Sequence, residues 1–398
     1  MRNYRSVVLL GPTQVGKSTL GGRLLSLSSL TIEVNHESTS AHETVRSEEV
    51  DYVKYRELCD SIPSERLNGH SEQNCCRSME IEDLEAELIV IPGKRKFWKW
   101  HDYGCADADA SMIVVRVREG GNLEIIELIE PVSHSLAMGT KLAGVILNNF
   151  EGFSPETVMK CRLEVENDLA RLFSAATGKT PIFEVSSTGE CQDLLRHIMR
   201  IPVPERDDVS PFEMSINSIF DKGDSVILGG KIRRGHLSVG DTVFLMPGRV
   251  ELKISSIRIS RGRDVTRVSA GRVIAVRIQG GVSRRQVSVG MALVGDVSVG
   301  RETRLVRAEM CFFNNKHPIR AGFSPVVSIL ACQAHGKIIS VETKEQINLG
   351  ETAIVTVGFS KTVFVQAHHS TKSSFSRIVF RHSNAVIAVG VIREILDE

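Results

Sequence analysis

The sequence predicts an α/β domain built on an open parallel sheet, followed by two antiparallel β-barrel domains. An apolar run from Val7 leads through a glycine-rich loop into a helical pattern. Apolar, strand-like runs then alternate with helical patterns up to about residue 200. Beyond residue 212 the helical periodicity stops, and short β-branched runs recur between Gly, Asn or Ser turns. These three observations together predict the fold class.

The stretch VVLLGPTQVGKSTL, residues 7–20, contains the spacing G-x-x-x-x-G-K-[ST] directly after an apolar run. Two glycines at this spacing let backbone N–H groups converge on phosphate oxygens, the lysine reaches the outer phosphates, and the next hydroxyl can bind Mg²⁺. The alternative is a glycine-rich turn with an exposed lysine. We favour an α/β P-loop nucleotide-binding domain because strand and helix patterns flank the loop. The predicted nucleotide-binding residues are Gly11, Pro12, Thr13, Gln14, Val15, Gly16, Lys17, Ser18 and Thr19.

The rest of the first 200 residues continues this alternation. Buried strands are predicted at residues 82–91, 112–117, 143–147 and 181–185, and the clearest helix at residues 155–173. Such alternation is typical of a parallel sheet with helices on both faces. Residues 31–87, by contrast, are acidic and poorly periodic, with 15 Asp or Glu against five Lys or Arg. We expect that segment to be a long, mobile insertion.

Three prolines with intervening charges, in IPVPERDDVSPF at residues 201–212, predict a semi-rigid linker. The β-branched runs that follow form two sets, and the second set begins near Leu305. Each set is long enough for one small barrel. We therefore predict the nucleotide-binding domain at residues 1–203, the first barrel at 204–300 and the second at 301–398.

The composition is that of a globular protein, and no apolar run approaches the roughly 18 to 20 residues that cross a membrane. The formal net charge is +1, but residues 207–398 hold 26 Lys or Arg against 17 Asp or Glu. This balance favours a polyanionic partner, and the alternative is that these charges are solvated strand faces. The eight cysteines are irregularly spaced, and the phosphate loop begins at Gly11. We expect a cytoplasmic protein with reduced thiols and no signal peptide.

A nucleotide-binding domain followed by two β-barrels resembles the translational GTPases of the elongation factor one-alpha group. That group contains elongation factors, the class-two release factor and the ribosome-rescue GTPase that acts with Pelota-type proteins. The resemblance covers essentially the whole chain and rests on GKSTLGGRLL from Gly16, HPIRAGFSPVV from His317 and RHSNAVIAVGVI from Arg381. The segment GGKIRRGHLSVGDTVFLMPG from Gly229 and the double glycine after Leu20 look most like the release factor. The resemblance implies GTP and Mg²⁺ as cofactors.

The first switch of this family reads E-R-x-x-G-[IK]-T, and its Thr hydroxyl binds Mg²⁺ when the γ-phosphate is present. The corresponding residues here are Glu65, Arg66, Gly69 and Ser71. The resemblance therefore implies that Ser71 is a metal ligand together with Ser18. The alternative is that this segment is a solvated acidic loop.

The second switch of the family reads D-x-P-G-H and precedes an Asp at the start of the next strand. Counting back from Asp109 places Val90, Pro92, Gly93 and Lys94 in this motif. The position of the Asp that holds the water shell of Mg²⁺ is thus occupied by Val90, which offers no oxygen. The position of the His that orients the attacking water is occupied by Lys94. A protonated lysine cannot accept a hydrogen bond from water. We expect Lys94 to be inactive in catalysis, hydrolysis at background level and weakened dependence on Mg²⁺.

The guanine-reading motif N-K-x-D of the family becomes Asn148, Asn149, Phe150 and Glu151, directly after a predicted strand. Glu151 keeps the carboxylate that accepts hydrogen bonds from guanine, whereas Asn149 cannot cover the base as a lysine stem does. A further base-contacting loop of the family corresponds to Ser186 and Ser187. The resemblance implies a preference for guanine that is weaker than usual.

Two other stretches suggest partner contacts. The segment KRKFWKWH, residues 94–101, interleaves cations with aromatic rings, which indicates contact with ribosomal RNA or a partner factor. The alternative is a half-buried amphipathic helix. In the third domain, the family stretch G-R-F-x-x-R resembles the segment containing Phe375, Arg377 and Arg381, although Ser376 and Ile378 replace the Gly and Phe. The resemblance implies that these three residues bind the partner.

Two classes of function compete. In the first, the chain is a GTP-binding translation factor that carries a tRNA-mimicking partner to the ribosome. We favour delivery of a class-one release factor in termination; the alternatives are a Pelota-type partner in ribosome rescue and aminoacyl-tRNA in elongation. In the second class, the chain is a non-hydrolysing scaffold that uses the same surfaces. We expect contact with ribosomal RNA, no membrane association and a monomer apart from the partner complex.

Overall fold

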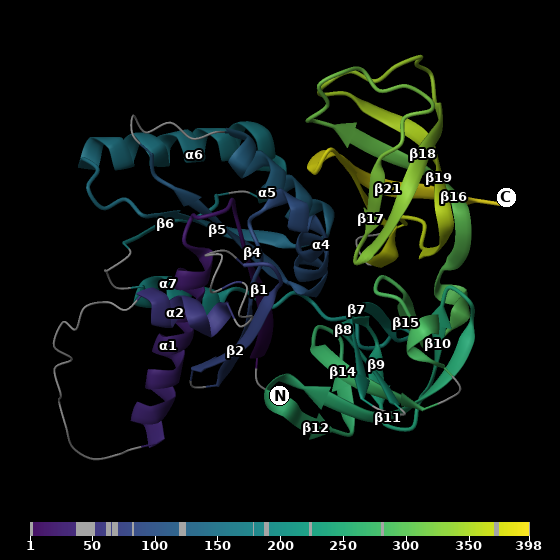
Figure 1. Cartoon of the computed structure of the whole chain (residues 1–398), viewed down its shortest axis with the longest axis horizontal. Coiled ribbons are helices and arrows are strands. Elements are labelled where there is room, and N and C mark those ends of the chain that lie inside the picture. The colour runs from purple at the N-terminus through teal and green to yellow at the C-terminus, as the bar shows by residue number, and fades with distance from the viewer. Residues whose placement is uncertain are drawn as a thin grey trace. The chain divides into compact units, whose positions relative to one another are not determined.

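The computed structural model describes residues 3–36, 52–60, 65, 71–81, 83–118, 125–177, 179–186, 191–222, 225–279, 282–369 and 374–397 (Figure 1). The chain divides into two compact units. The first unit is Met1–Gly104, Ala108–Leu136 and Thr140–Pro204, and the second is Cys105–Asp107, Ala137–Gly139 and Glu205–Glu398. The division after Pro204 lies within the proline-rich segment at residues 201–212. The three domain boundaries given above stay predictions.

A six-stranded sheet forms the centre of the first unit, in the order β2-β3-β1-β4-β5-β6. Its strands are β1 (Asn3–Leu10), β2 (Cys75–Ile81), β3 (Leu84–Val90), β4 (Ala110–Arg116), β5 (Lys141–Asn148) and β6 (Ile182–Val185). Parallel pairing joins β3, β1, β4, β5 and β6, whereas the edge strand β2 is antiparallel to β3. The predicted α/β fold class is therefore confirmed, with one antiparallel edge strand added to the parallel sheet.

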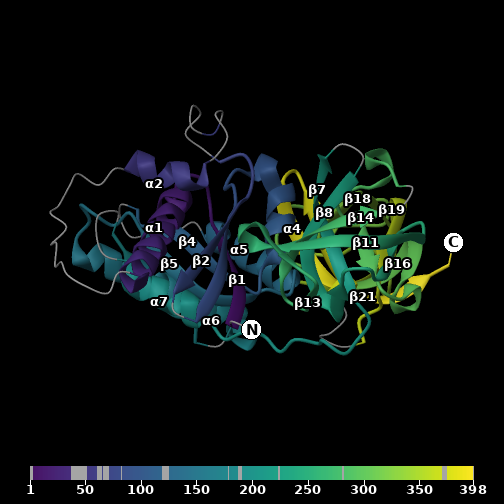
Figure 2. The same ribbon diagram turned by 90° about the horizontal axis from the view of Figure 1, so that it is seen from below.

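Helices cover both faces of this sheet (Figures 1 and 2). They are α1 (Lys17–His36), α2 (Tyr52–Cys59), α4 (Trp98–Asp107), α5 (Ile125–Ala137), α6 (Pro155–Thr177) and α7 (Gln192–Arg200), with the 3₁₀ turn η1 (Arg95–Phe97) before α4. Val7 and Leu9 of β1 share a buried apolar cluster with α1 and α7, while Val8 and Leu10 are equally buried on the opposite face. Both faces of the strand are therefore packed, as a continuous apolar run predicts. Among the described helices, none is long and apolar enough to cross a membrane.

The acidic segment at residues 31–87 is more ordered than the sequence predicts. It contains the end of α1, all of α2 and β2, and the start of β3. Strand β2 is an edge strand that buries only Cys75 and Met79 fully, so its sequence lacks the apolar alternation of a half-buried strand. The prediction of a single mobile insertion is wrong for these elements. The parts at 37–51, 61–64 and 66–70 lie outside the described residues.

The double glycine of α1 explains how α2 reaches its position. A Cβ atom on Gly22 would lie 1.8 Å from the backbone oxygen of Tyr55 in α2, and one on Gly21 would lie 2.8 Å from Val90 Cγ2. Only glycine permits such close approach of a helix to neighbouring backbone. The pair Gly21-Gly22 therefore lets α2 pack directly on α1, beside the loop that precedes α1.

The first barrel of the second unit closes through six strands in the order β10-β15-β7-β8-β14-β11, because β10 also pairs with β11. These strands are β7 (Glu213–Lys222), β8 (Ser225–Arg234), β10 (Thr242–Met246), β11 (Val250–Ile259), β14 (Val273–Gln279) and β15 (Ala292–Val294). The short strands β9 (His236–Ser238), β12 (Arg263–Val265) and β13 (Arg267–Ser269) add to it. Three 3₁₀ turns, η3 (Ser260–Gly262), η4 (Arg284–Gln286) and η5 (Val297–Val299), lie between its strands or after them.

The second barrel is closed in the order β16-β19-β18-β17-β20-β21. Its strands are β16 (Arg301–Phe312), β17 (Val326–Ile329), β18 (Cys332–Val341), β19 (Thr352–Val365), β20 (Arg377–His382) and β21 (Ala385–Leu396), and the turn η6 (Ser374–Ser376) precedes β20. Alternate residues of β16 fill the interior, as in Val306, Ala308 and Met310. Two antiparallel barrels after the α/β domain are what the sequence predicts, and this prediction is confirmed.

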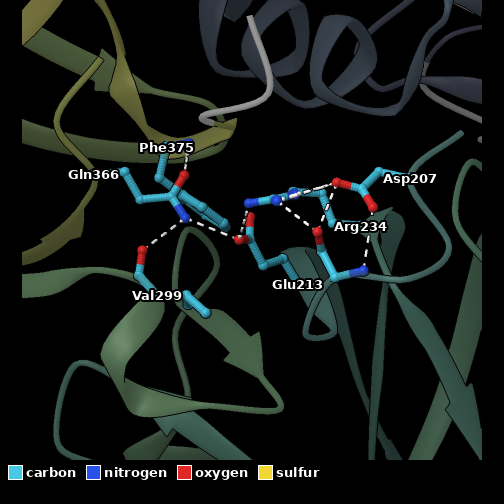
Figure 3. A network of polar contacts seen from close by, with 7 residues as sticks. Asp207, Glu213, Arg234, Val299, Gln366 and Phe375 are labelled. Atoms are coloured by element: carbon cyan, nitrogen blue, oxygen red, sulfur yellow. Dashed lines mark hydrogen bonds and ion pairs between the residues drawn. The ribbon is translucent and has the colours of Figure 1, made fainter. Parts of the chain in front are cut away.

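A polar network joins the two barrels within the second unit (Figure 3). Gln366, just after β19, donates its side-chain amide to Glu213 Oε1 at 2.9 Å and to the Val299 carbonyl at 3.0 Å. Arg234 of β8 also donates to Glu213 Oε1, at 3.1 Å. Burial raises the pKa of Glu213, while the Gln366 hydrogen bond and the Arg234 charge oppose that shift. One buried carboxylate of the first barrel is thus held by a side chain of the second.

Candidate nucleotide-binding site

The loop between β1 and α1 has the backbone of a phosphate-binding loop. Gly11 has a φ of 141° and Gly16 a φ of 86°, in the region that favours glycine. A Cβ atom on Gly11 would lie 2.2 Å from the Val114 carbonyl oxygen, and one on Gly16 would lie 2.4 Å from Asn148 Nδ2. Both glycines of the motif are therefore required by the local geometry, and the loop leads directly into the N-terminus of α1.

Lys17 lies under this loop. Its Nζ donates to the carbonyl oxygens of Gly11, at 2.8 Å, and Pro12, at 2.6 Å. Burial lowers the pKa of Lys17 to about 7, and the nearby charge of Asp60 opposes that shift. The ammonium is thus positioned inside the loop, where a bound phosphate would favour its charged form.

A cavity of about 220 Å³ opens beside the loop. Its walls are Thr13, Gln14, Gly16, Lys17, Ser18, Thr19, Arg56, Asp60, Ser71, Gly93 and Lys94. These residues come from the phosphate loop, from the end of α2, from the segment before β2 and from the turn after β3. Backbone N–H groups and ammonium groups of this kind fit the phosphates of a nucleotide.

One side of the cavity gathers oxygen atoms. The Ser18 and Ser71 hydroxyl oxygens lie 2.8 Å apart, and Ser71 Oγ donates to Asp60 Oδ1 at 2.7 Å. Burial raises the pKa of Asp60, and hydrogen bonds from the two serines oppose that rise. Hydroxyl and carboxylate oxygens are the ligands that Mg²⁺ prefers, so Ser18, Ser71 and Asp60 would be the residues to hold this ion.

The carboxylate of Glu65 holds the chain that carries Ser71. Glu65 is buried, and its Oε1 accepts the backbone N–H groups of Glu72, at 2.8 Å, and Gln73, at 3.1 Å. Ser71 lies beside Ser18, and its role as a metal ligand stays a prediction. The other two first-switch residues, Arg66 and Gly69, lie outside the described residues.

The opposite side of the cavity is formed by the turn after β3. A Cβ atom on Gly93 would lie 2.4 Å from the Pro12 carbonyl, so this turn packs against the phosphate loop. Val90 is 2% exposed and belongs to the apolar cluster beneath α1, and Lys94 lines the cavity. Among the described residues of this side, none offers a carboxylate to the cavity.

His101 is the histidine closest in sequence to this turn, and it is not placed to act on water in the cavity. It lies in α4, is buried, and its Nε2 lies 2.8 Å from the Pro92 carbonyl oxygen. Burial lowers the pKa of His101 to about 3, so the ring is neutral and its Nε2–H is donated to Pro92. His101 therefore does not supply the group that Lys94 replaces.

The structure also places the residues of the base-reading loops. Asn148 Nδ2 donates to the Val15 carbonyl at 2.8 Å, which ties the end of β5 to the phosphate loop. Ser186 Oγ donates to Glu151 Oε1 at 2.7 Å, so the two loops that the resemblance assigns to the base meet. Asn149 has a φ of 54°, and Ser187 lies outside the described residues. Their roles in base recognition stay predictions.

The residues predicted to bind a partner lie in the second barrel. Phe375 is 2% exposed, with its ring 5.2 Å from that of Phe364, and its N–H donates to Gln366 (Figure 3). Arg381 is 7% exposed, and its Nη2 donates to Ser328 Oγ at 3.1 Å. Phe375 belongs to a buried cluster that both barrels contribute to, and Arg381 packs within the second barrel. The part of these residues and of Arg377 in partner binding stays a prediction.

The aromatic segment at residues 94–101 is half buried, which agrees with the amphipathic alternative. Trp98 is buried against His101 and His134, with ring centroids 4.3 and 5.3 Å apart. The exposed side carries Lys96 and Lys99, which stack on neighbouring aromatic rings. Packing within the domain is a sufficient reason for this composition.

Arg56 and Asp60 are cavity residues that sequence reasoning missed. Arg56 lies in the last turn of α2 and Asp60 directly follows this short helix, inside the acidic segment at residues 31–87. The only available signal was an apolar pair, Leu58 and Cys59, next to a carboxylate. Such a pattern is too short to separate a helix from a polar loop.

Comparisons with known proteins agree with this geometry. The model of the elongation factor Tu GTP binding domain matches residues 2–203. The eukaryotic peptide chain release factor GTP-binding subunit of Kluyveromyces lactis is 24% identical over 353 residues, which cover 82% of this chain and 50% of that protein. Protein HBS1 of Drosophila melanogaster is 22% identical over 431 residues, covering 99% of this chain and 63% of that protein. The chain thus spans between half and two thirds of the length of these two relatives.

Among solved structures, the Ski7 GTPase-like domain of S. cerevisiae bound to GTP superposes with a TM-score of 0.73. The two chains are 16% identical, and the match covers 98% of this chain and 97% of that one. At this identity the likeness shows a shared fold. Because the domain model matches half of the chain and carries the loop described above, the chain belongs to the translational GTPase family, whose nucleotide-binding domain is that of elongation factor Tu.

Proposed function

We propose that this chain is a translation factor that binds GTP, hydrolyses it at background level and carries a protein partner to the ribosome. One observation supports GTP binding most directly. The loop from Gly11 to Lys17 keeps the glycine conformations and the buried ammonium that phosphates need, beside a cavity of about 220 Å³. A cradle of this kind would serve no purpose in a protein that had lost phosphate binding.

Slow hydrolysis and weak dependence on Mg²⁺ follow from the other side of the cavity. Val90 is packed in the core and Lys94 lines the cavity, so neither residue can hold a metal-bound water or orient an attacking one. Since GTPase catalysis consists largely of positioning and charge stabilisation, their replacement should cost orders of magnitude in rate.

Titration with a fluorescent GTP analogue, with Mg²⁺ and with a chelator, tests the first part. We expect saturable binding in both buffers, with affinities that differ by less than about tenfold because Val90 and Lys94 offer the metal no carboxylate. Absence of saturable binding in both buffers would end the proposal. Phosphate release in the presence of ribosomes tests the second part, and multiple rapid turnovers would show that Lys94 is compatible with catalysis.

Termination is the task we favour, with a class-one release factor as partner in the cytoplasm. Support comes from the release-factor relative, which is 24% identical over 82% of this chain. HBS1 matches 99% of the chain at 22% identity, so ribosome rescue with a Pelota-type partner is the second candidate. Co-purification of the tagged chain distinguishes these tasks. Recovery of a class-one release factor supports termination, and recovery of a Pelota-type protein contradicts it.

A further inference from the structure

Helix α2 delivers an arginine to the wall of the phosphate cavity. Arg56 lines the cavity together with Gly16, Lys17 and Ser18 of the phosphate loop. It can do so because Gly22 of α1 lets the backbone at Tyr55 approach within van der Waals contact. The placement of Arg56 is therefore a consequence of close helix packing.

Two contacts of the Arg56 guanidinium bear on its role. Its Nε lies 2.9 Å from Oδ2 of Asp60, the residue that follows α2. Its Nη2 donates to the Glu65 carbonyl at 3.3 Å, near the long end of the hydrogen-bond range. The Arg56 side chain is 29% exposed, whereas that of Asp60 is 2% exposed. The Asp60 side chain is thus buried, whereas the Arg56 side chain that lines the cavity is partly exposed.

The charges that line the cavity favour an anion. Its described walls carry three cationic side chains, those of Lys17, Arg56 and Lys94, and one carboxylate, that of Asp60. Val90 contributes no charge where the family has an aspartate that helps to hold the metal. The protein itself therefore supplies positive charge close to where the phosphates of a nucleotide would lie.

We propose that Arg56 binds the terminal phosphate of GTP and so makes the chain prefer the triphosphate over the diphosphate. This inference rests on the proposed binding of GTP. The planar guanidinium can present two N–H groups to one phosphate and stays charged at any physiological pH. A terminal phosphate would give Arg56 Nη2 a charged acceptor in place of the neutral Glu65 carbonyl. The contact between Nε and Asp60 would remain and would orient the guanidinium.

A purely structural role predicts different behaviour. If Arg56 only held Asp60 in place, its removal would weaken binding of GTP and GDP to the same extent. If Arg56 binds the terminal phosphate, its removal weakens GTP binding and leaves GDP binding nearly unchanged. The loss should also be largest without Mg²⁺, because the metal carries part of the same charge.

The test compares full-length wild type, Arg56→Gln and Arg56→Lys with the matched control Arg162→Gln. Arg162 has a partner at the same i,i+4 spacing, Glu166, at 3.2 Å, and a similar exposure of 34%, but it lies on α6 outside the cavity. Dissociation constants for mant-GTP and mant-GDP are measured in Mg²⁺ and in EDTA, and thermal unfolding is recorded for each variant.

For Arg56→Gln we expect mant-GTP affinity in EDTA to fall by about tenfold or more, a smaller fall in Mg²⁺ and a change below about twofold for mant-GDP. The mant-GTP affinity of Arg56→Lys should lie between those of wild type and Arg56→Gln. Lysine keeps the positive charge but cannot present the planar pair of N–H groups of arginine. If Arg56→Gln lost affinity equally for both nucleotides, or lost none, the inference would be overturned, while the proposed binding of GTP would stand. If the wild type binds neither nucleotide, the proposed function fails and this inference fails with it.

Discussion

The two sides of the phosphate cavity differ in chemistry although both flank the same loop. On the first-switch side, Ser71 and Asp60 bring oxygen atoms to Ser18 through hydrogen bonds of 2.8 and 2.7 Å. On the second-switch side, Val90 is buried in the apolar core and Lys94 faces the cavity. Among the described residues, one side offers oxygen donors to the cavity, and the other offers a lysine and no carboxylate.

Under the proposed function, binding and hydrolysis of GTP depend on separate residues of one site. A triphosphate is held by backbone N–H groups, cations and metal ligands, which act whether or not the nucleotide is cut. Hydrolysis adds the demand that a water be oriented at the terminal phosphate. A chain can lose the second function and keep the first, since the residues concerned come from different segments of the fold.

Replacement of Lys17 should cause the greatest loss of nucleotide affinity. Lys17→Ala removes the buried ammonium under the loop, and two charged hydrogen bonds to phosphate are worth about 3 kcal/mol or more together. We expect the affinity for mant-GTP to fall by on the order of 100-fold. Lys160→Ala, an exposed lysine of α6, is the control and should bind like wild type. Retained affinity in Lys17→Ala would mean that the loop is not the binding site.

The next prediction restores the missing carboxylate of the second-switch side. Because Val90 is 2% exposed in an apolar cluster, Val90→Asp should lower the free energy of unfolding by about 3 kcal/mol in the absence of ligand. GTP with Mg²⁺ should recover part of this loss, and GTP with EDTA should not. Urea unfolding under the three conditions measures both effects.

The control for this prediction is Val90→Asn, because the asparagine side chain has nearly the shape of aspartate and carries no charge. It should be destabilised too, without the recovery that depends on the metal. Equal recovery of the Asp and Asn variants would show that position 90 does not face the metal, and the contrast between the two sides would lose its basis.

The smallest expected effect concerns the first-switch side. Ser71→Ala removes one hydroxyl from the pair at 2.8 Å, so mant-GTP affinity in Mg²⁺ should fall by about three- to fivefold. Affinity in EDTA should change by less than about twofold. Ser71→Thr keeps the hydroxyl and should behave like wild type. A loss of the same size in both buffers would assign Ser71 a structural role through Asp60 and remove it from the metal site.

Local motifs were predicted well from the sequence. The loop from Gly11 to Lys17, the strand and helix that flank it and the change to β-barrels after residue 212 all appear where spacing and periodicity place them. The metal-ligand role of Ser71 and Ser18 was implied by the resemblance to the family and stays a prediction. These features depend on residues close together in sequence, or on a motif whose spacing is fixed.

Long-range packing was not predicted. The polar helix α2 and the edge strand β2 were hidden in an acidic segment, so Arg56 and Asp60 were overlooked as cavity residues. Phe375 and Arg381 were chosen from a motif, and their burial in the second barrel could not be read from it. Burial of a polar or aromatic side chain depends on what packs over it, which neighbouring residues in sequence do not specify.

The phosphate-binding loop, the parallel sheet and the two barrels are encoded locally, because glycine conformations and hydrophobic periods act over a few residues. The set of side chains that lines the phosphate cavity depends on how distant elements pack. Gly22 admits α2 against α1, and that contact brings Arg56 and Asp60 to Lys17 from about 40 residues away in the chain. Such convergence is set by packing of elements distant in sequence, where the free energy of burial outweighs local preference.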